Sequence, residues 1–163
     1  MPIVTVPDDA TQVEIKKAFF KVADPVYAIY KQGKRFFILK SKEGHPIKRV
    51  SVKNCKAFIA FTKSFDEILH ETILPNSYVN KEGDTIQTYV DHFSITDLYL
   101  ILGNKRKKIS VNWFNVRPTD NPFKDKGRIT HKNINYLHNK RTKIIALTSL
   151  LENEIPKKIN STK

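Results

Sequence analysis

Residues 26–42, VYAIYKQGKRFFILKSK, decide the fold of this chain of 163 residues. Two runs of aromatic and β-branched residues flank Gln32-Gly33-Lys34, which has the length and the glycine content of a β-hairpin turn. The runs IKRVSV (47–52) and KAFIAFT (56–62) continue in the same style. The sequence therefore predicts an antiparallel meander over residues 26–62.

Helices are predicted on both sides of this meander. Asp8 and Asp9 precede apolar residues at helical spacing, which predicts a helix over residues 10–22. Ser64 and Glu67 have the spacing of a capping box, which predicts a short helix beginning at Ser64. Residues 133–155 carry apolar residues near one stripe and predict a long amphipathic helix.

The second half of the chain predicts further strands. The run TIQTYVD (85–91) is one, and LYLIL (98–102) and KKISVNWFNV (107–116) flank a second turn. A helix from Ser94 is the alternative for the first arm of this hairpin. Residues 117–127 contain two prolines and a glycine among polar residues and predict a loop.

The predicted fold class is α+β, an antiparallel sheet of about six to seven strands packed with two or three helices. We expect one domain over residues 1–155 and a flexible polar tail over residues 156–163. Cys55 is the one cysteine, so no internal disulfide forms, and no run approaches a signal peptide or a membrane span. These features favour the cytoplasm. The excess of Lys over Arg, with abundant Ile and Asn, is typical of AT-rich bacterial or phage genomes.

Charge is the most informative property of the sequence, because a formal net charge of +13 favours a polyanionic partner. Residues 31–63 contain ten basic residues against Glu43 alone, and residues 105–143 contain twelve against Asp120 and Asp125. The stretch between them is acidic. If the two basic stretches meet in the fold, they form one cationic surface. General lysine enrichment, solvated on every face, is the alternative.

Strand alternation in residues 107–116 places Phe114 on the same side as Lys108, Ser110 and Asn112. An exposed ring among basic side chains is suited to stack an unpaired base, at about 1–3 kcal/mol per base. The alternative is that Phe114 packs under a helix; Trp113, on the other face, is predicted to be core. The predicted nucleic-acid contacts are Lys34, Arg35, Lys40, Arg49, Lys53, Lys105, Arg106, Lys107, Lys108, Asn112, Phe114, Arg117, Lys140, Arg141 and Lys143.

The leading functional hypothesis is a non-enzymatic protein that binds single-stranded nucleic acid, with RNA favoured over DNA. We expect no cofactor, no metal and no membrane partner, and a homo-oligomer is compatible with the available sheet edges. The first alternative is a metal-dependent nuclease, and the second is an adaptor whose basic surface binds an acidic protein. The residues considered for a nuclease site are Asp84, Asp91, His92, Asp97, His131 and His138.

Overall fold

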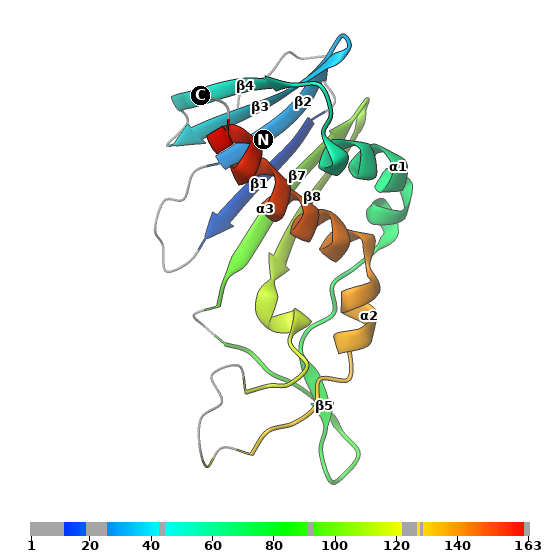
Figure 1. Cartoon of the computed structure of the whole chain (residues 1–163). Coiled ribbons are helices and arrows are strands. Elements are labelled where there is room, and N and C mark those ends of the chain that lie inside the picture. The colour runs from blue at the N-terminus through cyan, green and yellow to red at the C-terminus, as the bar shows by residue number, and fades with distance from the viewer. Residues whose placement is uncertain are drawn as a thin grey trace.

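An antiparallel sheet of six strands forms the centre of the molecule, and a separate sheet of two short strands lies below it (Figure 1). The computed structural model describes residues 12–18, 26–42, 45–90, 93–121, 127 and 129–161. In chain order the elements are β1 (Gln12–Ala18), β2 (Val26–Gln32), β3 (Arg35–Lys42), β4 (His45–Val52), α1 (Lys56–His70), β5 (Ser77–Val79), β6 (Thr85–Gln87), β7 (Ile95–Leu102), β8 (Lys105–Asn112), η1 (Trp113–Val116), α2 (Tyr136–Arg141) and α3 (Lys143–Ser161).

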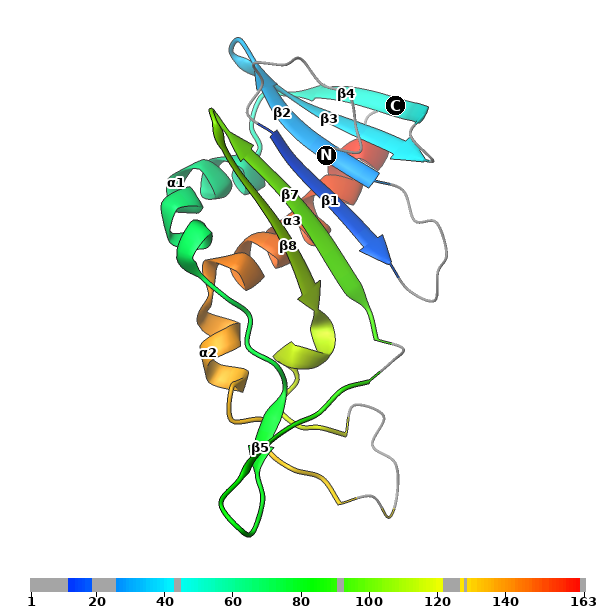
Figure 2. The same ribbon diagram turned by 180° about the vertical axis from the view of Figure 1, so that it is seen from behind.

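The strand order in the large sheet is β4-β3-β2-β1-β7-β8, so β4 and β8 are its two edges. Helices α1 and α3 lie against one face of this sheet, and Figure 2 shows the opposite face from behind, where none of the described helices lies. The α+β class, the antiparallel pairing and the long C-terminal helix are confirmed. The prediction that all strands form one sheet is wrong, because β5 and β6 pair only with each other.

The main core lies between the sheet and the two long helices. The strands contribute residues such as Ile38 and Leu98, α1 contributes Phe61 and Phe65, and α3 contributes Leu151, all of them essentially inaccessible to solvent. Rings in successive turns of α1 meet edge to face, with 5.3 Å between the centroids of Phe61 and Phe65. Burial of these side chains against the sheet fixes which face α1 covers.

Two carboxylates link α1 to α3. The Glu154 carboxylate of α3 accepts the backbone N–H groups of Lys56 (3.1 Å) and Ala57 (2.7 Å) at the start of α1. Glu71, which follows α1, accepts those of Lys143 (2.9 Å) and Ile144 (3.0 Å) at the start of α3. Each helix therefore satisfies free donors at the N-terminus of the other, where a negative charge is stabilised.

The predicted N-terminal helix is wrong over the residues that the structure describes. Residues 12–18 form β1, which pairs with both β2 and β7 and is thus an interior strand of the sheet. The sequence VEIKK alternates apolar and polar residues as well as it fits a helix, and the two flanking strands decide between these patterns. The remainder of the predicted helix lies outside the described residues.

The run KAFIAFT is helical rather than a strand. Helix α1 begins at Lys56, and Ser64, the predicted cap, lies in its interior. The buried residues of α1 are Ala57, Phe58, Phe61, Phe65 and Ile68. Their spacing of three and four continues through residue 62, and this period over the whole segment outweighs the β propensity of the first seven residues.

The predicted C-terminal helix is divided at Thr142. The Thr142 hydroxyl donates to the Asn139 carbonyl at the end of α2 and accepts the N–H of Ile145 in α3, so Thr142 caps the second helix. Helix α3 then continues past residue 155 to Ser161, and Ile159 is buried. Over residues 156–161 the expected flexible tail is therefore helix instead; residues 162 and 163 lie outside the described residues.

Both predicted hairpins are present. Gly33 (φ +59°) and Gly103 (φ +60°) occupy the left-handed positions of the β2–β3 and β7–β8 turns, which glycine adopts most easily. Of the strand predicted for residues 85–91, β6 covers residues 85–87, residues 88–90 are not in a strand, and Asp91 lies outside the described residues. Residues 117–121 and 127 are in neither helices nor strands, apart from a bridge between Thr119 and Lys132. No helix in the described part of the chain is long and apolar enough to cross a membrane.

Candidate nucleic-acid interface

The sheet face turned away from α1 and α3, here called the outer face, is organised in rows that run across the strands. Directly paired residues of an antiparallel sheet share a face. The register gives one row of six paired positions: Arg49, Leu39, Ala28, Glu14, Tyr99 and Lys108. The neighbouring row, two residues along, is formed by Ser51, Phe37, Tyr30, Gln12, Ile101 and Arg106.

At one edge of the outer face lies a group that we call the β4 margin, formed by Arg35, Phe37 and Arg49. The Arg49 guanidinium carbon is 4.2 Å from the centroid of the Phe37 ring, and Phe37 in turn stacks on Tyr30 (5.4 Å between centroids, 19° between planes). Arg49 also donates a hydrogen bond to Gln32 (3.4 Å). Arg35 and Arg49 are both exposed. Arg49 is thus held beside aromatic rings, and Arg35 is exposed on the same face.

At the opposite edge lies the β8 margin, formed by Tyr99, Arg106 and Lys108. The Lys108 Nζ is 5.3 Å from the centroid of the Tyr99 ring, and a hydrogen bond with Tyr99 raises the pKa of this lysine. Arg106 and Lys108 are exposed, and Tyr99 is half-buried. Asp97, on the same face, accepts a hydrogen bond from the Ser110 hydroxyl. The β8 margin therefore repeats the combination of cations and an aromatic ring.

The centre of the outer face differs from its margins. Val26, Ala28, Tyr30 and Leu39 are buried there and form a small cluster against which Phe37 packs. The two basic stretches of the sequence therefore present cations on the same face of the sheet, but at its opposite edges. The single merged surface considered in the sequence analysis is not formed by these strands.

Three of the predicted contact lysines are bound to groups of the protein itself. The Lys107 ammonium donates to the carbonyls of Ile68, Leu69 and Glu71 at distances of 2.5–3.0 Å, where α1 ends. Lys105 pairs with Asp66 (2.8 Å), which lowers the pKa of that carboxyl, and Lys143 pairs with Glu67 (3.7 Å). These three side chains fasten β8 and α3 to α1.

Phe114 is not available for stacking, because it is buried (1% exposed). Strand β8 ends at Asn112, whose side chain accepts the N–H of Phe114 (3.0 Å) and caps the 3-10 turn η1. The strand alternation that predicts an exposed Phe114 therefore ends two residues before this residue. The Phe114 ring instead contacts the Phe93 ring, with 5.7 Å between the centroids. Trp113 packs against the main core as predicted, and its indole N–H donates to Thr96 (2.9 Å).

The other predicted contacts are dispersed. Lys34 is exposed in the β2–β3 turn, Lys53 is exposed after β4, and Lys40 is half-buried on the helix side of the sheet. The Arg117 guanidinium carbon is 5.6 Å from the Phe93 ring centroid. Lys140 and Arg141 are exposed on α2. Of the fifteen predicted residues, the structure gathers Arg35 and Arg49 at one margin and Arg106 and Lys108 at the other.

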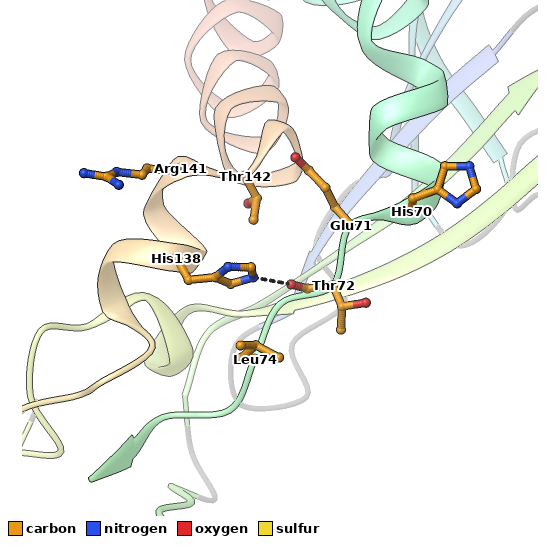
Figure 3. A pocket seen from close by; sticks show the side chains of 7 residues that line it. All are labelled: His70, Glu71, Thr72, Leu74, His138, Arg141 and Thr142. Atoms are coloured by element: carbon orange, nitrogen blue, oxygen red, sulfur yellow. Dashed lines mark hydrogen bonds between the residues drawn. The ribbon is translucent and has the colours of Figure 1, made fainter. Parts of the chain in front are cut away.

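A cleft of about 430 Å³ opens between the end of α1 and the junction of α2 with α3. Figure 3 shows its lining, formed by His70, Glu71, Thr72, Leu74, His138, Arg141 and Thr142. The carboxylate in the cleft caps α3, as described above. His138 Nε2 lies 3.4 Å from the Thr72 carbonyl, and the Arg141 guanidinium points away from the other lining residues (Figure 3). No sequence motif connects these residues, since they come from segments about 70 positions apart.

One histidine is held in a defined orientation. His131 Nδ1 lies 2.9 Å from the buried carboxylate of Asp120, and its ring stacks on Tyr78 (3.8 Å between centroids, 8° between planes). His131 also donates its backbone N–H to the same carboxylate (2.8 Å). This group joins the ends of the 120–131 segment to β5.

Among the described residues, no three His, Cys, Asp or Glu side chains are grouped closely enough to hold a metal ion. Asp91 and His92, two of the residues considered for a nuclease, lie outside the described residues. Cys55 is buried at the start of α1, where desolvation raises the pKa of its thiol.

Comparison with known proteins adds no family assignment. A scan of protein-family models, a search of curated proteins and a search of solved structures each found no match.

Proposed function

We propose that this protein binds single-stranded nucleic acid, RNA in preference to DNA, without cleaving it, and that the two margins of the outer face make the contacts. The cations of the margins would hold phosphates, and the rings beside them would stack on unpaired bases. RNA is favoured because its specific recognition mostly uses splayed single-stranded bases.

The observation that supports this proposal is a contrast between the two sides of the sheet. In the described part of the chain, the ion pairs that Lys105, Lys143 and Lys158 make with carboxylates lie on the helix side. The arginines of the margins, Arg35, Arg49 and Arg106, contact rings, amides or solvent instead. Cations without a carboxylate partner are the ones that a polyanion neutralises at the lowest desolvation cost.

The test is fluorescence anisotropy with labelled single-stranded RNA, single-stranded DNA and duplex DNA at two or more salt concentrations. Four cations that contact phosphates of a single strand give a slope of log K against log salt of about −2.8. Replacing Arg106 and Lys108 by Met should reduce this slope by about 1.4. It should weaken binding by roughly fivefold to thirtyfold, at about 0.5–1 kcal/mol for each exposed contact.

A matched control removes the same charge from the other side of the sheet. Lys63 and Lys157 are exposed on α1 and α3, and their replacement by Met also lowers the net charge by two. This control should change affinity much less than the Arg106 and Lys108 pair. Equal losses would show that binding follows net charge alone and would contradict the proposed interface. Cleavage that EDTA abolishes would favour the nuclease alternative.

A further inference from the structure

The two margins are the ends of one row, and their separation follows from the strand order. Arg49 and Lys108 occupy the outermost positions of the row of six paired residues, with five inter-strand steps between them. At about 4.8 Å per step, the backbones of these two residues are about 24 Å apart. A ligand has to be at least this long to contact both edges.

Between the margins, the described side chains provide few groups that could bind a phosphate. Ala28 and Leu39, in the same row, are buried and apolar. Tyr30, in the row beside it, is buried as well. Among the outer-face residues whose side chains the structure describes, the cations therefore form two separate pairs, Arg35 with Arg49 and Arg106 with Lys108. A short oligonucleotide can contact one pair, whereas a longer one can contact all four side chains.

The direction of the strands also changes from one edge of the sheet to the other. Neighbouring strands of a twisted sheet differ in direction by roughly 20–25°, so five steps add up to about 100° or more. In Figure 2 the edge strands β4 and β8 run in clearly different directions. A strand lying across the sheet has to turn its contacting side by that amount, and the rotatable backbone of a single strand can do so.

We propose that one nucleic-acid strand crosses the β-strands along this row and occupies both margins at once. The inference rests on the proposed function and adds a length requirement to it. At the 3.4 Å spacing of stacked nucleotides, a distance of 24 Å corresponds to about seven nucleotides. Once a strand is bound at one margin, its contact with the other is intramolecular, so affinity rises steeply when the strand becomes long enough.

The experiment is a length series of oligouridylates of 3, 5, 7, 9, 12 and 15 nucleotides, measured by calorimetry or competition at constant salt. We expect affinity to rise at least tenfold between about five and nine nucleotides, because linked contacts gain an effective concentration, and then to change little. The variant with Arg106 and Lys108 replaced by Met should lose this step but keep about half of the affinity for the trinucleotide. Replacing Arg35 and Arg49 by Met should give the same pattern independently.

The outcomes separate this inference from the proposed function. A gradual rise with length and no step, or a step that persists in either double variant, would overturn the bridging inference while leaving single-strand binding intact. Absence of binding at every length would overturn both. The variant with Lys63 and Lys157 replaced by Met should keep the step, since neither residue belongs to the row.

Discussion

Replacement of Lys107 by Met tests whether this lysine is part of the structure or of the interface. The sequence predicts a phosphate contact, because Lys107 belongs to the densest basic cluster of the chain. In the structure its ammonium donates to three carbonyls at the end of α1. The Ile68 and Leu69 carbonyls belong to the last turn of α1 and have no partner within the helix, the Glu71 carbonyl follows directly, and a cation is favourable at this end of a helix.

The magnitude follows from these contacts. A hydrogen bond to a charged group contributes about 1.5–3 kcal/mol, but the three bonds share one ammonium. Desolvation also lowers the pKa of Lys107, which shows that part of the gain is offset by loss of water. We therefore expect a loss of about 2 kcal/mol, which for a chain of this size lowers the melting temperature by about 4–8 °C.

The control is the adjacent residue of the same strand. Arg106 is exposed on the outer face, so its replacement by Met should change stability by no more than about 0.5 kcal/mol. Thermal denaturation followed by circular dichroism measures both variants, and anisotropy well below the transition measures RNA binding. The Lys107 variant should lose stability and keep affinity, and the Arg106 variant should do the reverse. Equal melting temperatures for the two variants, or a larger affinity loss for Lys107, would refute this assignment.

Three further predictions concern the scaffold. Burial alone would raise the pKa of Glu154, but hydrogen bonds from backbone N–H groups and from Lys158 outweigh it and lower this pKa. The carboxylate therefore adds its full stability above its unfolded pKa of about 4.3. This stability is lost as the pH falls through the lower pKa of the folded state. In urea denaturation at pH 7, the E154Q variant should therefore be less stable than the unchanged protein by about 1–2 kcal/mol. This difference in stability should disappear below about pH 4. The E82Q variant, changed on an exposed turn, should show no such difference. The F114A variant should lose about 3–5 kcal/mol of stability, and its ratio of single-strand to duplex affinity should be unchanged; a selective loss of single-strand binding would contradict the buried position. The N139L variant removes a buried amide that makes hydrogen bonds with both the N–H and the carbonyl of Leu74. Chemical denaturation should therefore show a loss of stability of about 3–5 kcal/mol. A loss below about 1 kcal/mol would show that water replaces these hydrogen bonds.

Local sequence patterns correctly predict those elements whose conformation depends on residues close together in the chain. The two hairpins follow from glycine turns between β-branched runs, and these turns need no distant contact to form. The basic character of the proposed interface follows from composition. Arg49 and Lys108 are candidates from the sequence alone, because alternation along a strand assigns side chains to faces without knowledge of the neighbouring strands.

The tertiary structure decided the rest, because several segments fit two patterns equally well. Residues 12–18 became a strand because β2 and β7 both pair with them, and the run 56–62 became helical because its rings pack between the sheet and α3. Phe114 is buried because β8 ends two residues earlier, and Lys107 is occupied because α1 ends beside it. A sequence shows which side chains can bind a phosphate. Only the strand order places the two basic stretches at opposite edges of one sheet, since pairing between strands joins residues far apart in the chain and local chemistry does not encode that distance.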